Sequence, residues 1–575
     1  MRYFVKKSTP SKKGIYLQIY QSGYSPERGS RNRSYKAIGY VNDLINNGIA
    51  DPYSYAKNIC DELNKTNQLQ KEKQIGDAST QKFLGHFLIK AMFDKLNMYD
   101  DLNIVSSNYK SHYSFSSFIR ALTYAQIIKP GSKLDIVKNV LPNIYDIEKY
   151  SYDQVLDGIE FIGSDYHKYI EVLNKHIEKL YKRNFNTCYF DCTNYYFEID
   201  YEDNFRKKGS SKEERHCPIV GQALLLDADM IPVDMELYPG NQSEKTYLRK
   251  RIENLKSKHE IKGRIIQVAD KGLNCARNIY AAVKEAKDGY IFSKSVHGRN
   301  LNSVEKKWVI LEDNNANKWN VVKNYKDDVL YKYKECVDTF NYSCKLNPED
   351  ENEITFAVEE KRVVTYNPDL ACKQRREIQA EVDRLKAKIS YKQIVREEIG
   401  DSVKYVNFEA KTKDGKKVKI ASSINEEKVK EDLLYAGYNL LVTSEVNAPA
   451  TEIYKAYHNL WRIEHSFRLM KTYLEARPVF VSLKDTICGH FLIVYYGLVI
   501  IRLLELKIFN DELAAEQIFD FIRDYKITEN YDGTYINNAT ASDTYFKIKE
   551  KLGLSKLGNV YLSKKDVESL LKIEI

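Results

Sequence analysis

The sequence predicts an α/β fold, because runs of β-forming residues are followed by segments with helical periodicity. The β-runs are TCYFDCTNYYFEID at 187–200, IVGQALLLDADMIPVDMELYPGN at 219–241, GRIIQVADKG at 263–272 and GYIFSKS at 289–295. A period of 3.6 residues is seen before them, in FLGHFLIKAMFDKL and SFIRALTYAQII. With 575 residues, 43% hydrophobic and 29% charged, the chain predicts several globular domains rather than one binding module.

The N-terminal residues are expected to form a basic β-hairpin. GIYLQIYQ at 14–21 and RSYKAIGYV at 33–41 flank the turn-forming stretch SGYSPERGS, and the polar residues 52–75 are interpreted as a linker. The net charge of the chain is +9, and residues 1–40 hold nine Lys or Arg against Glu27 alone, a balance of +8. A polyanion such as nucleic acid is the expected partner of this end, and a solvated basic surface is the alternative. The candidate DNA-binding residues are Lys6, Lys7, Lys12, Lys13, Arg28, Arg31, Arg33 and Lys36.

The remaining chain is expected to form a helical region, a divided α/β core and an insertion. The insertion is indicated by short charged strands, KWVILED, WNVVKNY, EITFAVEEKRVVTY and KKVKIAS, with one amphipathic helix. In that helix Ile378, Val382, Leu385 and Ile389 recur at helical spacing. The sheet is expected to resume at GYNLLVTSE. The predicted domains are 1–75, helical 76–183, core 184–295, β-rich insertion 296–430, core 431–510 and a C-terminal domain 511–575 of unassigned role.

Membrane, secreted and zinc-binding proteins are not expected. The most apolar stretch, HFLIVYYGLVII at 490–501, is shorter than the roughly 20 residues that span a bilayer and predicts a buried helix. The first residues lack the apolar core of a secretory signal, so we expect an intracellular protein. None of the nine cysteines forms a CxxC pair, and Cys188 and Cys192 are interpreted as packing residues.

Three acidic residues stand where a purely structural role is unfavourable. Asp191 interrupts a strand, where a buried carboxylate needs a compensating cation. Asp270 follows the apolar run IIQVA, and ligands collect at such strand ends in α/β sheets. Glu464 lies in a long helical segment, IYKAYHNLWRIEHSFRLMKTYLEA. Seven residues turn about 700°, so Tyr457, Glu464 and Lys471 share one helix face.

These three carboxylates offer only hard oxygen ligands, which suit Mg²⁺ or Mn²⁺. Two such ions would act on the attacking and leaving oxygens of a phosphodiester. Arg468 lies about 40° from Glu464 on the helical wheel, so Tyr457, Arg468 and Lys471 are the candidate phosphate-binding residues. An exposed helix face with ordinary salt bridges is the alternative interpretation.

The helix resembles the signature of DDE transposases of bacterial insertion sequences, in the family-four branch. That signature is Tyr, two residues, Arg, three residues, Glu, six residues, Lys, and Tyr457, Glu464 and Lys471 match it in register. The arginine position holds Leu460. Arg462 is about 200° round the helix from Glu464 and cannot replace it, whereas Arg468 is on the required side.

The resemblance extends over most of 80–505. YFDCTNYYFE is similar to the first-aspartate strand of the family, and VADKGL is similar to its second-aspartate turn. The resemblance implies a ribonuclease H-like core with a β-rich insertion before the catalytic glutamate. It also implies two Mg²⁺ or Mn²⁺ ions per active site, held by Asp191, Asp270 and Glu464. Some relatives hold a flipped base with an insertion-domain tryptophan; Trp308 and Trp319 lie in that region, and neither is assigned.

The implied function is DNA transposition in the bacterial cytoplasm. The enzyme would bind terminal inverted repeats, nick the DNA and join the freed 3′-hydroxyl ends to target DNA, as a homodimer in a synaptic complex. A nuclease of the same fold without strand transfer and an inactive DNA-binding descendant are the alternatives. Glu475 is the alternative third acid. A metal-bound hydroxide makes His465 and His216 unnecessary as general bases.

Overall fold

The chain forms two compact units, and its secondary structure is the mixed α/β type that the sequence predicts. The first unit comprises residues 1–87 and 524–573, and the second comprises 88–523 with 574–575. This computed structural model describes residues 2–10, 13–25, 29–72, 81–110, 112–209, 217–258, 261, 263–297, 301–310, 319–347, 349–391, 400–412, 418–530 and 533–575. The predicted domain boundaries stay predictions.

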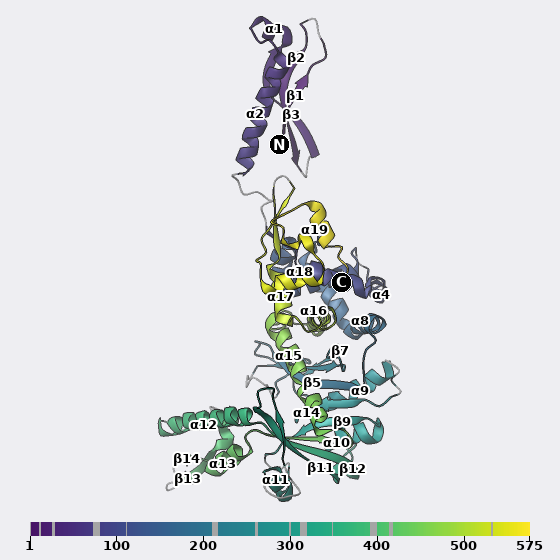
Figure 1. Ribbon diagram of the computed structural model, residues 1–575, viewed down its shortest axis with the longest axis vertical. Helices are drawn as coiled ribbons and strands as arrows, with labels where there is room; N and C mark the ends of the chain where they lie inside the picture. The colour runs from purple at the N-terminus through teal and green to yellow at the C-terminus, as the bar shows by residue number, and fades with distance from the viewer. Residues whose placement is uncertain are drawn as a thin grey trace. The chain divides into compact units, whose positions relative to one another are not determined.

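The N-terminal module is a three-stranded antiparallel sheet with a helix along one side (Figure 1). The strands β1 (Arg2–Lys7), β2 (Tyr16–Ser25) and β3 (Gly29–Tyr40) pair in the order β1-β2-β3. The predicted hairpin is therefore present as β2 and β3, and β1 is a strand that the sequence pattern did not indicate. Helices α1 (Val41–Asn46) and α2 (Pro52–Glu72) follow.

Helix α2 occupies the segment that was expected to be a linker, and it packs against β1 and β2. Asp51 caps it by accepting hydrogen bonds from the backbone N–H groups of Tyr53 and Ser54 at 2.9 and 3.1 Å. The expectation failed because the buried stripe consists of small residues, Ala56 and Cys60, which produce little apolar periodicity.

The remainder of the first unit brings distant parts of the sequence into one antiparallel sheet. The order β18-β17-β16-β4 places β4, from before the helical region, beside strands from the C-terminal part of the chain. The elements are β4 (Gln81–Phe83), β16 (Lys526–Glu529), β17 (Tyr535–Asn537), α18 (Asp543–Lys551), β18 (Tyr561–Leu562) and α19 (Lys564–Leu570).

A helical layer opens the second unit, as predicted for the region before the first β-run. Its helices are α3 (Phe87–Leu96), α4 (Tyr99–Val105), α5 (Phe115–Ile128), α6 (Lys133–Asp135), α7 (Tyr152–Ser164) and α8 (Tyr166–Tyr181). The apolar helix α16 (Lys484–Leu503) packs against α5 and α7. Gly163 and Gly489 allow the close approach, since a Cβ on Gly489 would lie 2.0 Å from the carbonyl oxygen of Ile159.

Helix α16 is long and apolar enough to cross a membrane, but its 18-residue apolar window is entirely buried inside the protein. The prediction of a buried helix at 490–501 is therefore confirmed.

A nine-stranded mixed sheet forms the centre of the second unit, in the order β10-β11-β12-β15-β9-β8-β5-β6-β7. The pairs β5/β8 and β8/β9 are parallel, and the other pairs are antiparallel. The strands are β5 (Thr187–Tyr196), β6 (Ile219–Leu226), β7 (Pro232–Pro239), β8 (Ile266–Ala269), β9 (Gly289–Lys294), β10 (Asn320–Lys323), β11 (Val329–Cys344), β12 (Ile354–Tyr366) and β15 (Tyr438–Thr443).

Helices connect and cover this sheet. They are α9 (Glu244–Lys258), α10 (Ala276–Tyr280), α11 (Ser303–Ile310), α14 (Ala450–His458) and α15 (Trp461–Arg468). Helix α17 (Ala515–Asp524) follows α16 and meets α15 through Glu516. A π-helical turn, Leu469–Tyr473, continues α15. The single long helix that was expected over 453–476 is thus interrupted near Asn459 and widened after Arg468.

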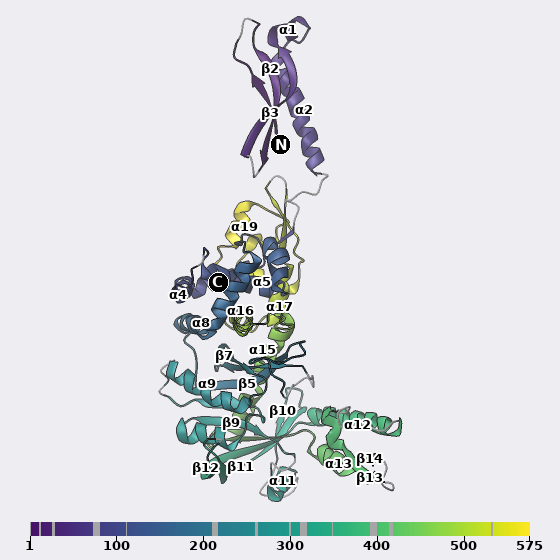
Figure 2. The ribbon, with the colours of Figure 1, turned by 180° about the vertical axis from the view of Figure 1, so that it is seen from behind.

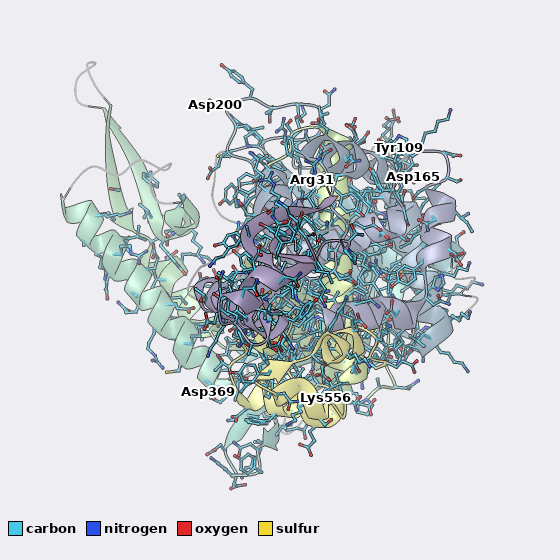
Figure 3. The ribbon with its side chains drawn as sticks, turned by 90° about the horizontal axis from the view of Figure 1, so that it is seen from above. Arg31, Tyr109, Asp165, Asp200, Asp369 and Lys556 are labelled. Carbon is cyan, nitrogen blue, oxygen red and sulfur yellow. The ribbon has the colours of Figure 1, made fainter. Side chains whose placement is uncertain are left out.

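The insertion is only partly separate from the sheet. Strands β10, β11 and β12 extend the sheet itself, whereas α12 (Pro368–Tyr391), β13 (Val406–Thr412), β14 (Val418–Ile424) and α13 (Glu426–Tyr435) form a lobe with its own small core. Figure 3 shows this lobe, with Asp369 at the start of α12. Val382 and Leu385 are buried in its core, as the helical spacing predicted.

One predicted strand of the insertion is wrong. KWVILED was expected to be extended, but residues 303–310 form α11. Asn302 caps this helix by accepting hydrogen bonds from the backbone N–H groups of Val304 and Glu305, both at 2.9 Å, and this local start signal outweighs the β-propensity of Trp308 and Val309.

Candidate active site

Asp191 and Asp270 lie at neighbouring positions of two parallel strands. The register pairs Phe190 of β5 with Ala269 of β8, so the next residues along the two strands are Asp191 and Asp270. Adjacent strands are about 4.8 Å apart, which brings two carboxylates of like charge close together. Both side chains are partly buried. The predicted pair of strand acids is therefore placed side by side by backbone pairing.

Tyr457 of α14 contacts Asp270 directly. Its hydroxyl donates a hydrogen bond of 2.8 Å to Oδ1 of Asp270. Burial raises the pKa of Tyr457 well above its ordinary value, and the negative charges of Asp270 and Glu464 raise it further. The phenol therefore stays protonated and keeps donating at neutral pH.

A cleft of about 200 Å³ lies beside Asp270 and Tyr457. Ser293 and Lys294 at the end of β9 line it, and it extends to Gln374 of α12. The cleft thus extends from Asp270 to α12 of the inserted lobe.

Glu464 lies on α15, which packs against β5. Its side chain is exposed, and its charge acts on Tyr457, so the two residues face a common region despite the helix interruption between them. The wheel argument for Tyr457 and Glu464 holds because Asn459 and Leu460 keep right-handed helical dihedrals across the break.

The position of the missing signature arginine faces the protein interior. Leu460 is buried, with 7% of its surface exposed. Arg462 forms an ion pair with Asp511, with its Nη2 2.5 Å from Oδ2, and its guanidinium lies over the ring of Trp461. Neither residue provides a cation beside Glu464.

The other two helix cations have different surroundings. Arg468 is exposed, and its Nη2 lies 3.1 Å from Oε1 of Glu516 on α17. Lys471 lies in the π-helical turn, with its Nζ 5.4 Å from the ring centre of Tyr195 on β5. The structure therefore places Lys471 beside the strand of Asp191 and Arg468 on a carboxylate of a different helix.

Buried Arg502 holds the turn that carries Glu464. Its Nη2 donates to the carbonyl oxygen of Arg462 at 3.0 Å and to Oγ of Ser466 at 3.0 Å. It also donates to Nδ1 of His465 at 3.2 Å, while Nη1 pairs with Glu505. Arg502 has no exposed surface, so these bonds are shielded from water.

His465 continues this network rather than acting on a substrate. Because its Nδ1 accepts from Arg502, its Nε2 donates to Oε1 of Glu516 at 2.8 Å. Burial and the charge of Arg502 lower the pKa of His465, so it is neutral near pH 7. His216, the other histidine considered, lies outside the described residues.

Three side chains cap the carbonyl groups that follow the helix. Arg523 donates to Tyr473 at 2.5 Å, Gln126 donates to Leu474 at 2.6 Å and His490 donates to Ala476 at 3.2 Å. The last carbonyls of a helix have no partners within it, so such donors fix its end.

These supporting residues were not found by sequence reasoning. The available signal was that Arg502 and His490 are polar residues within the mainly apolar part of α16, residues 487–503, where an uncompensated charge is costly.

Carboxylates suit Mg²⁺ or Mn²⁺, and two of the three predicted ligands are neighbours. In the part of the chain that the structure describes, no three His, Cys, Asp or Glu side chains already form a metal-binding group. Tyr457 occupies one oxygen of Asp270. The donor types fit a divalent ion, and the side chains would have to draw together around it.

The structure also gives the surroundings of the other residues considered in the sequence analysis, namely two tryptophans, one glutamate and two cysteines. Trp308 and Trp319 pack against the main core and enclose Nζ of Lys334, which is 5.5 and 4.6 Å from their ring centres. Glu475 follows the π-helical turn with a left-handed φ of 41°, so the helical wheel that made it an alternative acid does not reach it. Cys188 and Cys192 are buried in the core, as expected of packing residues.

The N-terminal cations are exposed on the first unit. This group comprises Lys6, Lys7, Lys13, Arg31, Arg33 and Lys36. Lys12 and Arg28 lie outside the described residues.

No protein-family model matches the sequence, and no curated protein matches it. Among solved structures, a chain of the piggyBac transposase synaptic complex with hairpin DNA, determined by cryo-EM, is similar at 8% identity with a TM-score of 0.37. The match covers 86% of this chain and 88% of that chain. A TM-score this low supports no conclusion about activity.

Proposed function

We propose that this chain is a DNA transposase that nicks DNA by metal-dependent hydrolysis of a phosphodiester and joins the freed 3′-hydroxyl ends to target DNA. The observation that carries the proposal is the side-by-side placement of Asp191 and Asp270, with Tyr457 bonded to Asp270 and Glu464 close enough to act on Tyr457. Two acids on adjacent parallel strands, together with a helix acid, are an arrangement that serves phosphoryl chemistry.

The proposed core is ribonuclease H-like and consists of β5 to β9, β15 and the helices α14 and α15. The mixed sheet supports this proposal, because it brings the end of β8 beside the middle of β5, where Asp191 lies, and α15 packs against β5.

Asp191, Asp270 and Glu464 would hold two Mg²⁺ or Mn²⁺ ions. When bound, such ions act as Lewis acids and lower the pKa of water toward neutrality. The ions would also offset the repulsion between the two neighbouring aspartates when both are ionised. Tyr457, by donating to Oδ1 of Asp270, sets the orientation of that carboxylate.

The helix cations would hold the DNA phosphates. Lys471 lies beside β5, which is the strand that carries Asp191. Arg468 would exchange Glu516 for a phosphate, and this exchange costs little because an exposed ion pair contributes only about 0–1 kcal/mol. Arg468 would thereby supply a bidentate donor that Leu460 cannot provide.

The proposed partners are terminal inverted repeats and target DNA, with a second copy of the chain in a synaptic complex. The positive charge of residues 1–40 supports a polyanionic partner. The proposed location is the bacterial cytoplasm, and the complete burial of the apolar window in α16 is consistent with a protein outside membranes.

The test is incubation of the purified full chain with Mn²⁺ and labelled duplex DNA that carries the flanks of its own gene. Wild type should release and join ends, and Asp191→Asn, Asp270→Asn and Glu464→Gln should do neither. Glu475→Gln is the matched control, since it removes an exposed carboxylate eleven residues farther along, and it should remain active.

Three results would contradict the proposal. Cleavage without joining would indicate a nuclease, and bound but uncut DNA would indicate a binding protein. Cleavage that survives Asp191→Asn would place the active site elsewhere.

A further inference from the structure

The N-terminal sheet has α2 on one of its two faces. Side chains alternate between the faces of a strand, and residues paired directly across two strands share a face. Leu17 and Ile19 of β2 have no exposed surface. Lys7 of β1 pairs with Leu17, and its Nζ lies 4.3 Å from the ring centre of Tyr53 on α2. Figure 2 shows α2 running along the strands. The face of Leu17, Ile19 and Lys7 is here named the helix face.

Three cations of β3 lie on the helix face and are here named the cation row. The row consists of Arg31, Arg33 and Lys36, which pair with Gly23, Gln21 and Ile19 of β2. Regular alternation would place Lys36 on the opposite face from Arg33, since the two are three residues apart. The register instead shifts by one residue at Tyr35, which brings Lys36 opposite Ile19. This bulge therefore aligns all three cations on one face.

The cation row is open to solvent. Helix α2 packs against β1 and β2, whereas β3 is the outer strand of the described sheet. All three side chains of the row are exposed. Strands β1, β2 and β3 contain six Lys or Arg residues and no Asp or Glu. Among the residues that the structure describes, no carboxylate forms an ion pair with any of the three cations. A polyanion would therefore be attracted to this edge of the module.

The position of the row beside α2 favours contact with phosphates over contact with bases. A helix with its side chains is about 10–12 Å across, so α2 projects beyond the row on the helix face. Base edges are read by an element that enters a groove of the duplex, and α2 would keep the row out of such a groove. The phosphate backbone is the outermost part of a duplex and can reach the row from the outer side of β3. Gln21, the neighbour of Arg33 on this face, is already engaged, since its Nε2 donates to the hydroxyl of Tyr3 at 3.2 Å.

The length of the row suits several phosphates of one DNA strand. The β2 partners of the row are alternate residues, which lie about 6.6 Å apart, so the three cations span about 13 Å. One strand of a duplex advances about 3.4 Å along the helix axis for each phosphate. The long side chains of the row can therefore each neutralise a phosphate of the same strand.

We propose that the cation row binds phosphates of one strand of duplex DNA, so that the N-terminal module holds DNA without reading its sequence. The inference rests on the proposed function, because both require duplex DNA as the partner. It adds that the terminal repeats are recognised by a different part of the protein. It also excludes Lys6, which lies on the opposite face with its Nζ 4.6 Å from the ring centre of Tyr20.

Lys36 and Lys65 provide a matched pair of variants, because both are exposed lysines of the same module. Lys65 follows buried Ala56 by nine residues on α2, a turn of about 900° that directs Lys65 away from the sheet. Fluorescence anisotropy of the full chain on labelled duplex DNA should show Lys36→Ala weakening binding several-fold and reducing the slope of log K against log salt by about one. Lys65→Ala and Lys6→Ala should change neither quantity.

The loss in Lys36→Ala should be the same on the terminal-repeat duplex and on a scrambled duplex, because phosphates are common to both. A loss confined to the terminal-repeat duplex would overturn the inference, and so would tighter binding of the same sequence as a single strand. Equal affinities of Lys36→Ala and Lys65→Ala would also overturn it, and the row would then serve only to keep the outer strand from pairing with other chains. Thermal unfolding of each variant checks that the module remains folded.

The same measurements separate this inference from the proposed function. Asp191→Asn, which should not cleave, should bind like wild type. If wild type never cleaves but Lys36→Ala and Lys65→Ala differ in affinity, the cation row stands and the proposed activity fails. If wild type cleaves and joins ends but the two lysine variants bind equally, the cation row alone is refuted.

Discussion

Asp191 and Asp270 are positioned by the backbone of the sheet, whereas Glu464, Arg468 and Lys471 are positioned by side chains packed around a helix. The parallel register of β5 and β8 fixes the first two through main-chain hydrogen bonds. The helix that carries the other three is interrupted near Asn459, widened after Arg468 and held by buried polar groups. Asp191 and Asp270 are named the strand half of the site, and Glu464, Arg468 and Lys471 the helix half. Substitutions in the strand half should therefore leave the fold intact. The position of the helix half should change when distant residues that support the helix are substituted.

The largest expected effect is on catalysis by the strand half. Asp270→Asn should reduce cleavage by at least about a thousandfold, equivalent to about 4 kcal/mol in the barrier. The same variant should unfold at the same or a higher temperature, because removal of one of two adjacent negative charges relieves repulsion. Cleavage and thermal unfolding, each measured without metal and with Mn²⁺, test both parts. A strongly destabilised variant would contradict the view that the backbone alone positions this residue.

The helix half should be loosened most by Arg502→Met. Removing one partner of a buried ion pair costs about 3–5 kcal/mol, because Glu505 is left uncompensated. Arg183→Met is the matched control, since Arg183 is equally buried and pairs with Asp227 at 2.7 Å. Both variants should lose stability, but only Arg502→Met should speed hydrogen exchange of residues 461–473. Equal exchange in the two variants would show that Arg502 has no special role at the Glu464 turn.

Tyr457→Phe tests the contact that joins the two halves. A hydrogen bond to a charged group contributes about 1.5–3 kcal/mol, so cleavage should fall by roughly ten- to a hundredfold if the bond acts in the transition state. Because the pKa of Tyr457 is raised, its proton should not be lost between pH 7 and 9. Ionisation of Tyr457 should therefore cause no decline in the wild-type cleavage rate between pH 7 and 9. An unchanged rate in Tyr457→Phe would remove it from the site.

Acidification should lower the free energy of unfolding through His490, which donates to the carbonyl group of Ala476 after the π-helical turn. Burial, together with the charge of Lys133, lowers the pKa of His490 to about 3. The unfolded state therefore binds more protons between pH 6.5 and 3, and stability falls on acidification by about 1.4 kcal/mol per pH unit. The loss should be smaller in His490→Asn than in wild type, as measured by urea unfolding at pH 7 and 5.5. His112→Asn, at an exposed histidine, should behave like wild type.

The smallest expected effect concerns Arg468. Its ion pair with Glu516 is exposed, so Arg468→Gln should change the free energy of unfolding by no more than about 1 kcal/mol. The same variant should bind duplex DNA more weakly, because a phosphate contact is removed. Unaltered DNA affinity would leave Arg468 as a surface residue that serves only Glu516.

The sequence predicted the strand half well because β-runs and strand ends are local features. The β-runs with Asp191 and Asp270 became β5 and β8, and their parallel pairing is the part that no local pattern specifies. The helix half was predicted less completely. Wheel geometry placed Tyr457 and Glu464 toward one region, but it could not show that Arg468 meets Glu516 from α17, 48 residues later.

Other features were missed because they depend on long-range packing. α2 was interpreted as a linker because its buried residues are small, and α11 was interpreted as a strand because its cap outweighs its β-forming residues. The extension of the sheet by β10, β11 and β12 likewise requires pairing between β12 and β15, which lie more than 70 residues apart.

The central claim is that Asp191, Asp270 and Glu464 hold the same divalent ions, and Fe²⁺-mediated cleavage of the polypeptide tests it most directly. Fe²⁺ substituted for Mg²⁺ in the DNA-bound protein, with ascorbate and peroxide, cuts the chain close to its ligands. The account predicts cuts near residues 191, 270 and 464 that disappear with excess Mg²⁺ and in Asp191→Asn. Cuts elsewhere in the chain, or cuts that persist in Asp191→Asn, would contradict it.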